Sequence, residues 1–187
     1  MTRKAVFIFC ILMLTACGTD LSGKPPFAGL TFSTDFTHIT APDGRAWGVS
    51  FEYPNGATFR GVIRHVSRWH ESSLPFMTHD ILITTGDFAS KGTVNVFVVN
   101  HKFIYHYAEG SPSGSINLLH IFPASEEIYK QLLQVKDWNE VSISGREIDT
   151  IDMLDAEGAN RGYFKDHGCN SILVTSVTVH ATGTPVP

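Results

Sequence analysis

Several short runs of hydrophobic and other strand-forming residues, separated by turn signals, predict a mainly β protein. Every second side chain of a strand faces the same way, so alternation indicates a strand with one buried face. Turn-forming residues separate the segments. The pattern places strands at residues 59–67, 80–85, 93–99, 102–108, 141–151 and 171–180. Asn100 and His101 separate the middle pair, which predicts a tight hairpin.

One segment has helical spacing instead. Ile128, Leu132 and Val135 form a single apolar stripe within residues 125–136. Ser125 is a suitable N-cap residue, and the acidic residues after it are favoured by the helix dipole. Strands, then a single helix, then further strands is the order of elements in an OB fold. We therefore predict a mainly β protein, an OB-like small Greek-key barrel with one inserted α-helix.

The first residues have the pattern of an export signal. A basic start at Arg3 and Lys4 leads into an apolar run that is too short for a bilayer-spanning helix, which needs about 20 such residues. The run ends in Leu14-Thr15-Ala16-Cys17, which resembles the lipobox of bacterial lipoproteins. The resemblance implies lipidation of Cys17, by palmitate or similar acyl chains, and removal of the preceding peptide. Two or three such chains form a nearly permanent anchor.

This interpretation divides the chain into four parts. They are a lipoprotein signal peptide at residues 1–16, a lipidated tether at 17–30, a single β-rich OB-like domain at 31–182 and a tail at 183–187. Gly18 follows the cysteine, where by resemblance to enteric sorting rules an aspartate would favour the inner membrane. We expect a location in the cell envelope, with the outer membrane favoured over the inner one. The alternative is an ordinary secretory signal with a chance cysteine near its cleavage site.

Charge limits the expected partners. Removing residues 1–16 takes away two of the 14 basic residues and none of the 18 acidic ones, so the mature net charge is −6 with neutral histidines. Nucleic-acid-binding domains usually carry clustered lysine and arginine. We therefore expect no nucleic-acid partner. The expected partners are the lipid bilayer, through acylated Cys17, and an envelope protein or an oligomeric ligand.

Aromatic residues form one candidate ligand-binding group. Phe103, Tyr105 and Tyr107 fall on one strand face by the period of two residues. An aromatic face on an OB barrel can stack sugars or bases. The same alternation is also typical of core residues, because aromatic side chains pack well inside sheets. Both interpretations stay open for these three side chains.

Arginine and histidine supply the other candidate binding residues. Arg60, Arg64 and Arg68 are expected to share a strand face, where Arg64 could bind an anionic group unless the face is solvated or ion-paired. His120 lies between a strand segment and the helix. It is a candidate ligand-binding residue, and the alternative is a structural histidine whose ring nitrogens bond backbone groups.

Metal and thiol chemistry have weaker support. His65, His70 and His79 with Asp80 come closest to a metal-binding cluster, but their spacing is no known zinc signature. Cys169 could be a nucleophile beside His167, although a buried inert thiol is commoner. It has no disulfide partner, since Cys10 leaves with the signal peptide and Cys17 carries lipid. We predict no metal, no cofactor and no catalytic residue.

The C-terminal part of the chain resembles a group of uncharacterised bacterial proteins with an OB-like fold. The resemblance rests on residues 117–124, which include His120, on the helix, and on residues 137–145. Weaker matches are residues 74–80 and 168–170. Trp138-Asn139 replaces the Gly-Asp of that group, and Asn170 replaces an acidic residue. The resemblance covers roughly residues 70–180 and implies a fold, since the group has no settled activity.

These observations predict a membrane-anchored envelope lipoprotein that serves as a non-enzymatic binding or interaction module. The chain carries no P-loop, no Gly-x-Ser-x-Gly elbow and no paired-cysteine metal motif. A plasmid- or secretion-associated surface protein is a further possibility. The competing hypothesis is a small metal-dependent or histidine-dependent hydrolase of the periplasm. It would use some of His65, His70, His79, Asp80, His120 and His167.

Overall fold

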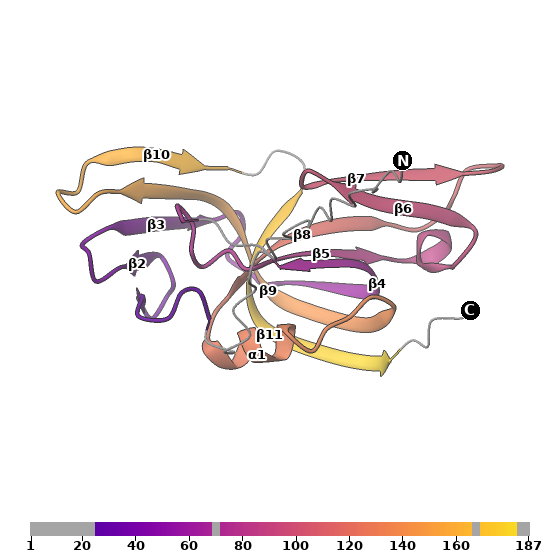
Figure 1. Cartoon of the computed structure of the whole chain (residues 1–187), viewed down its shortest axis with the longest axis horizontal. Coiled ribbons are helices and arrows are strands. Elements are labelled where there is room, and N and C mark those ends of the chain that lie inside the picture. Colours follow the sequence, from indigo (N-terminus) through magenta and orange to yellow (C-terminus); the bar gives the residue numbers. More distant parts are fainter. Residues whose placement is uncertain (1–24, 69–71, 166–168, 183–187) are drawn as a thin grey trace, which may run out of the picture.

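The structure is a computed structural model that describes residues 25–68, 72–165 and 169–182, and these form an elongated, mainly β molecule (Figure 1). Cys17, His70, His167 and the predicted tail lie outside the described residues. No helix among the described residues is long and apolar enough to cross a membrane. The described strands are β1 (Thr31–Phe32), β2 (His38–Thr40), β3 (Ala46–Phe51), β4 (Ala57–Arg68), β5 (His79–Thr84), β6 (Val94–Val99), β7 (Lys102–Tyr107), β8 (Ile116–Pro123), β9 (Asn139–Leu154), β10 (Asn160–Phe164) and β11 (Asn170–Thr182).

Strand pairing closes a barrel at the centre of the molecule. β4 pairs with β5, and β5 with β8, both antiparallel. β8 pairs with β11 in parallel, β11 with β9, and β9 returns to β4 to complete the ring. In chain order, β8 and β11 are the third and fifth strands of the ring, and they form its one parallel pair. The helix lies between the third and fourth strands. This is the topology of an OB fold. The predicted OB-like Greek-key barrel is confirmed.

The inserted helix lies between β8 and β9, as predicted, and is shorter than expected. α1 spans Glu126–Leu132. A short 3-10 helix, η1, spans Gly86–Ala89 and precedes β6. Ser125 caps the helix, because its hydroxyl accepts a hydrogen bond from the Ile128 amide at 3.2 Å. Leu132 and Val135 are buried against the barrel core.

The barrel interior is filled by side chains from every strand of the ring. Its buried members include Ile63, Ile81, Ile83, Leu119, Ile121, Val141, Ile143, Ile172 and Val174. Gly145 allows a close approach between strands, since a Cβ atom there would lie 2.0 Å from the Leu173 carbonyl oxygen.

A second core lies beside the barrel and was not predicted. The far half of β9 leaves the ring and pairs with β3 and β10, while β2 and β1 extend the sheet beyond β3 (Figure 1). Trp47 and Phe76 meet edge to face in this core, with ring centroids 5.3 Å apart. Phe27 is also buried there, against Tyr129. Packing of Phe27 means that the folded part includes residues 25–30, which were expected to belong to the tether.

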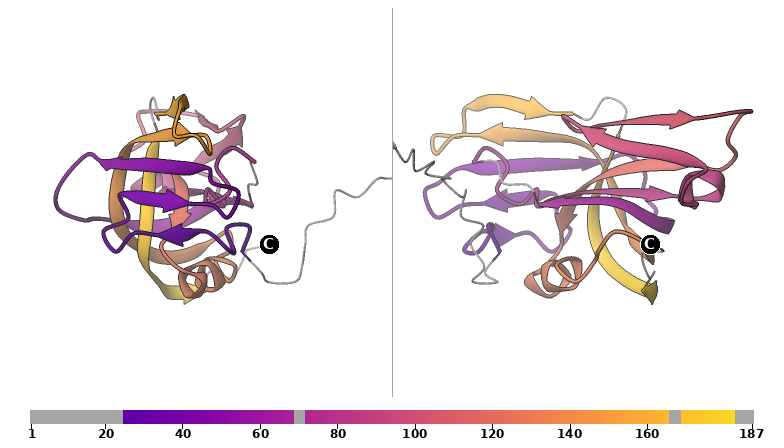
Figure 2. Two further views of the ribbon diagram at one scale, coloured as in Figure 1. Left: turned by 90° about the vertical axis from the view of Figure 1, so that its left-hand side faces the viewer. Right: turned by 45° about the vertical axis from the view of Figure 1, so that its right-hand side comes forward.

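β6 and β7 form a separate two-stranded sheet that we call the hairpin arm (Val94–Val99 and Lys102–Tyr107). The arm lies along the barrel, above β8 and β5 in the orientation of Figure 1, and the views of Figure 2 show it from two further sides. Asn100 and His101 form its turn, with φ angles of 50° and 59°. Two consecutive positive φ angles are those of a type I′ hairpin turn, so the predicted hairpin is confirmed.

A β-bulge in β4 changes which way its arginines face. The register between β4 and β5 shifts between Ile63 and His65, which inserts one extra residue into β4. Because side chains alternate along a strand, one inserted residue reverses the facing of all later residues. Arg60 and Arg68 therefore lie on opposite faces. The prediction that Arg60, Arg64 and Arg68 share one face is wrong for this reason.

Candidate functional site

A cross-strand pair on the outer surface of the barrel brings two of the candidate residues together. Asp80 on β5 lies directly opposite His120 on β8. Their neighbours Ile81 and Leu119 point into the barrel, so Asp80 and His120 point outward by strand alternation. The Asp80 carboxylate accepts a hydrogen bond from His120 Nδ1, with 2.7 Å between Oδ1 and Nδ1. Both side chains are nevertheless buried.

A third residue comes from the hairpin arm. β6 runs back along the barrel, so its turn ends beside the start of β5. There His101 Nδ1 lies 2.5 Å from the other carboxylate oxygen of Asp80, Oδ2. Asp80 thus bonds one imidazole with each of its oxygens. We call Asp80, His101 and His120 the carboxylate–histidine cluster.

Burial and hydrogen bonding act against each other on the carboxylate. Burial raises the pKa of Asp80, while the hydrogen bonds and positive charge of His120 and then of His101 lower it, and the net pKa lies below the usual range for an aspartate. Asp80 is therefore ionised at neutral pH and acts as an acceptor. The His101 side chain is 33% exposed, in contrast to 7% for His120, so the cluster opens to solvent on the His101 side.

Two further side chains line the cluster. The Cys169 thiol donates to the backbone carbonyl oxygen of His101 at 3.5 Å. The ring of Phe164, at the end of β10, meets the ring of His120 edge to face at 6.4 Å. Residues from the barrel, the arm and the β10–β11 region therefore converge here, where ligands bind many OB barrels.

The cluster has the components of two kinds of chemistry. Two imidazole nitrogens and a carboxylate are ligands of zinc-like ions. A carboxylate that bonds Nδ1 of a histidine also fixes the tautomer and orientation of the ring, as it does in catalytic histidines. Ligand atoms of Asp80, His101 and His120 lie within 4.8 Å of one another, so the described residues contain a convergent set where none was predicted.

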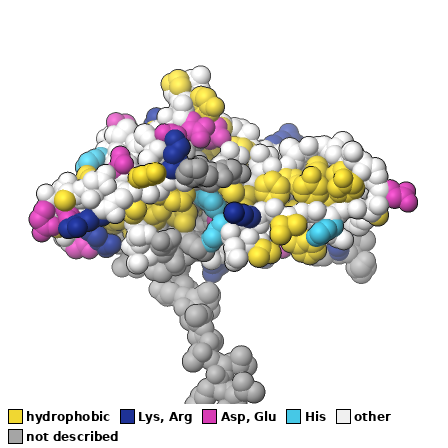
Figure 3. Space-filling view, turned by 90° about the horizontal axis from the view of Figure 1, so that it is seen from above, with side chains coloured by type: hydrophobic (Ala, Val, Ile, Leu, Met, Phe, Trp, Pro, Cys, Tyr) yellow, Lys and Arg dark blue, Asp and Glu magenta, His cyan; other side chains and the backbone are white. Residues whose placement is uncertain are grey.

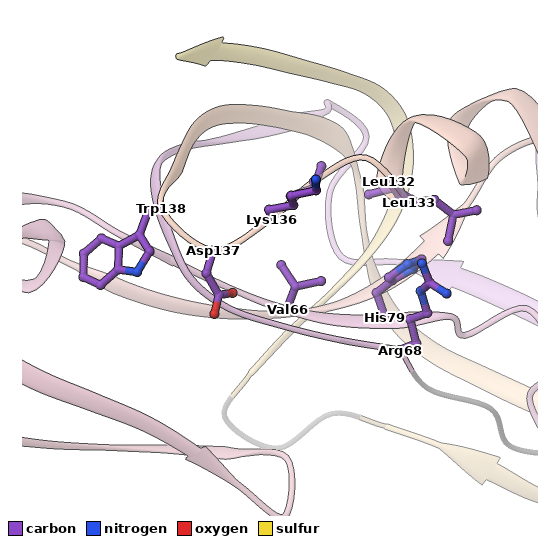
Figure 4. A pocket seen from close by; sticks show the side chains of 9 residues that line it. Val66, Arg68, His79, Leu132, Leu133, Lys136, Asp137 and Trp138 are labelled. Carbon is purple, nitrogen blue, oxygen red and sulfur yellow. The ribbon is translucent and has the colours of Figure 1, made fainter. Parts of the chain in front are cut away.

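The histidines that the sequence suggested as a metal cluster with Asp80 do not come together among the described residues. His65 lies opposite Leu82 on β5, and His79 points away from Asp80, toward the opposite face of the sheet. His79 lines a cleft of about 610 Å³ that lies between the end of β4 and α1 (Figure 4). Its Nδ1 bonds the Thr78 hydroxyl at 2.8 Å, while Nε2 is buried with no hydrogen-bond partner among the described residues. Burial, with a contribution from the charge of Arg68, lowers the pKa of His79 to about 4.

The candidate aromatic residues lie on the hairpin arm. Phe103, Tyr105 and Tyr107 share one face of β7, as predicted, and pair across the arm with Val98, Val96 and Val94. Val94 is fully buried and the ring of Tyr105 meets that of Phe88, so this face turns toward the barrel. Tyr105 and Tyr107 stack on each other and remain 42% and 48% exposed. They are not core residues.

The opposite face of the arm is exposed and carries three large apolar side chains beside the polar residues Asn95, Lys102 and His106. Phe97, Val99 and Ile104 lie there with exposed fractions of 51%, 52% and 48%. Figure 3 shows hydrophobic side chains gathered on the part of the surface that the arm forms. We call Phe97, Val99 and Ile104 the arm patch. Neighbouring apolar residues exposed on one surface are typical of an interaction site.

The Arg64 side chain forms structural contacts within the protein. Its guanidinium donates to the carbonyl oxygens of Phe88, Ser90 and Val94, which lie at the base of the arm. It also stacks on Trp138, with 4.4 Å from Cζ to the ring centroid. Burial lowers the pKa of Arg64, while Asp137 raises it, and the net pKa lies below the ordinary value. Arg64 holds the arm against the barrel with bonds that a ligand would have to displace.

His101 is the site residue that the sequence did not reveal. It was assigned only to a turn, because its partner Asp80 is 21 residues away in sequence. One signal was present, since the second position of such a two-residue hairpin turn usually carries glycine and here carries histidine. The stretches that carry the family resemblance, at Asp80, His120 and Cys169, do meet in space.

Together these features define an OB-fold domain with an added hairpin arm and a polar cluster on the outer surface of its barrel. No protein-family model matches the chain, and no curated protein sequence matches it. A search of solved structures matches the mitochondrial single-stranded DNA-binding protein Rim1 of S. cerevisiae. The identity is 8%, the TM-score is 0.31, and the match covers 72% of this chain and 99% of that one.

This match corrects one sequence-based prediction. We expected no nucleic-acid partner, and the matched protein binds single-stranded DNA by its title, which contradicts that expectation. At a TM-score of 0.31 the likeness carries no argument for what this chain binds. The net charge of the chain therefore does not exclude a nucleic-acid partner.

Proposed function

We propose that the protein is a lipid-anchored lipoprotein of the cell envelope that works as a non-enzymatic interaction module, and that the hairpin arm is its contact surface. The observation that carries the proposal is the arm patch. Phe97 and Ile104 are cross-strand partners, and each is about half exposed. Exposing such side chains to water is costly, because burial of apolar surface contributes about 25 cal/mol per Å². A partner that covers the patch recovers this free energy.

The way the arm is held supports the same role. Arg64 fixes the base of the arm to the barrel, and Asp87 bonds Ser113 at the same end through two hydrogen bonds. His101 holds the turn at the other end. An arm fixed at both ends presents its outer face in a defined orientation, which reduces the entropy lost on binding.

The anchor is supported by the sequence before the folded domain. The lipobox-like Leu14-Thr15-Ala16-Cys17 would place acyl chains on Cys17, and few residues separate Cys17 from Phe27, the first aromatic residue of the folded core. We propose the outer membrane as the more favoured location, because Gly18 rather than aspartate follows the cysteine. Such an anchor would keep the arm close to an envelope surface.

Site-specific photocrosslinking in cells tests the contact surface. A photoreactive phenylalanine analogue replaces Phe97, and in a matched control it replaces Tyr53, which is 58% exposed outside the arm. We expect a discrete adduct from position 97 that disappears when Ile104→Asn is added, and no such adduct from position 53. Nuclease and protease digestion then identify the chemical class of the partner. No adduct at 97, or equal adducts at both positions, would contradict the proposal.

Mass spectrometry of the mature N-terminus tests the anchor. We expect a diacylated or triacylated Cys17 and no residues before it. Cys17→Ser should abolish acylation and release the protein from membranes. Cys169→Ser is the matched control, because it removes the thiol beside His101 while leaving the lipobox unchanged. Cleavage at another position, or an unmodified Cys17, would refute the lipoprotein assignment.

A further inference from the structure

The carboxylate–histidine cluster joins two parts of the molecule that the barrel itself does not join. Asp80 and His120 belong to neighbouring barrel strands, whereas His101 belongs to the turn of the hairpin arm. We propose that Asp80, His101 and His120 form a binding site for one divalent transition-metal ion of the zinc class, and that this ion fixes the tip of the arm to the barrel. The proposal goes beyond the role of the arm patch and does not depend on it.

The ligand atoms suit such an ion in type and spacing. Zinc takes imidazole nitrogen and carboxylate oxygen ligands at about 2.0–2.2 Å, so two ligand atoms of a tetrahedral site lie about 3.3 Å apart. The two Nδ1–oxygen distances are 2.5 and 2.7 Å, and the ligand atoms of the cluster all lie within 4.8 Å of one another. The most widely separated atoms must move about 1.5 Å closer to reach this spacing, and the Nδ1 protons that bond Asp80 leave to solvent as the ion binds. His101 can make this shift because it lies in an exposed turn.

The charge of the cluster favours a cation. The Asp80 side chain is 2% exposed, and its bonding partners among the described residues are His101 and His120. A divalent ion bound here would compensate the buried negative charge of Asp80. The ion would also come from solvent by an open route, since His101 is the most exposed member of the cluster.

The backbone at His101 has an uncommon conformation for a residue with a side chain. Asn100 and His101 both have positive φ angles, and the second position of a type I′ turn favours glycine. His101 therefore adopts a backbone conformation that residues other than glycine seldom take. Strained positions of this kind are concentrated at functional sites, and here the strained residue is the one that carries the cluster's bond to the arm.

Metal titration of the full chain in detergent tests the site. The protein is stripped with EDTA, and Co²⁺ is then added as the spectroscopic probe, followed by displacement with Zn²⁺. We expect one equivalent of Co²⁺ with a visible d–d band, and at least a 100-fold loss of affinity in His101→Ala and in His120→Ala. His106→Ala is the matched control, because His106 is an exposed histidine on the same arm and should leave binding unchanged.

Hydrogen exchange tests the mechanical role. In the wild type, Zn²⁺ should slow amide exchange in β6 and β7 at least 10-fold, and this protection should be absent in His101→Ala. Circular dichroism checks that His101→Ala is folded, which we expect because the residue lies in a surface turn. Substoichiometric binding by the wild type, equal affinity in His101→Ala, or Zn²⁺ binding without protection of the arm would each overturn the proposal.

Discussion

Asp80 and His120 are direct cross-strand partners on β5 and β8, and their side chains share a buried hydrogen bond of 2.7 Å. The pair lies at the start of β5, immediately after the loop that leads from the first to the second strand of the barrel ring. The outward position of this pair is set by the strand register, because Ile81 and Leu119 beside it must point into the core.

Loss of the carboxylate should destabilise the domain. Asp80→Ala leaves the donors of two imidazoles without their acceptor, one of them buried, and a buried donor left unsatisfied costs about 1–3 kcal/mol, or more where a charged group was its partner. We expect a lower free energy of unfolding by about 3 kcal/mol, measured by urea denaturation in EDTA so that no metal contributes. Asp152→Ala, an exposed aspartate on β9, is the control and should change stability little. Equal effects of the two substitutions would contradict the structural role of Asp80.

Arg64 should contribute more to the stability of the domain than Arg60, which lies on the same strand. Arg64→Ala removes the donor to three carbonyl oxygens and the stack on Trp138, so we expect a loss of about 1–3 kcal/mol and faster amide exchange at the base of the arm. Arg60→Ala breaks only an exposed pair with Glu140 and should cost about 0–1 kcal/mol. The comparison fails if the two variants show the same stability and the same exchange.

Gly145 should tolerate no side chain. Its position between β4 and β11 leaves 2.0 Å for a Cβ atom before the Leu173 carbonyl oxygen, and the opposing atoms are backbone. We expect Gly145→Ala to lower the free energy of unfolding by more than about 3 kcal/mol, in thermal or urea denaturation. Gly48→Ala, where the nearest atom lies at an ordinary 3.8 Å, should stay within about 1 kcal/mol of wild type. A stable Gly145→Ala would refute the close packing described for the barrel.

The base of the arm should respond to acid. Hydrogen bonds from the Ser113 amide and hydroxyl lower the pKa of Asp87 below the ordinary value. A lowered pKa in the folded state contributes stability above the unfolded-state pKa of about 3.9, and this contribution is lost as the pH falls through the folded value. The Ser113 amide resonance in an NMR titration should therefore shift with a midpoint below pH 3.8. Asp87→Asn should abolish this shift, and a midpoint above that of a free aspartate would contradict the assignment.

Local patterns in the sequence predicted the elements that depend on local physics. Short runs of strand-forming residues located most strands of the ring, the Asn100-His101 turn was identified from its residue types, and the cap at Ser125 was correct. β8 was missed; like β5, which was predicted, it is buried on both faces and has no alternating pattern. The second core was missed because it joins Trp47 to Phe76 and Phe122, which are distant in sequence.

The candidate site was predicted only in part, for the same reason. Asp80 and His120 were noted as separate candidates, but their pairing depends on the β5–β8 register. The bulge near Arg64 changed which side chains share a face, and no residue pattern announced it. His101 became a site residue only through the path of the arm, which brings it back to the start of β5.

The continuity of β9 affects how the molecule unfolds. The strand is continuous from Asn139 to Leu154, and its first half closes the barrel while its second half carries the adjoining sheet. Ile143 belongs to one core and Ile151 to the other. Because the same backbone is ordered in both, melting either core frees part of a strand that the other requires. The two cores are thus coupled along one strand, and heating should produce one cooperative transition rather than two.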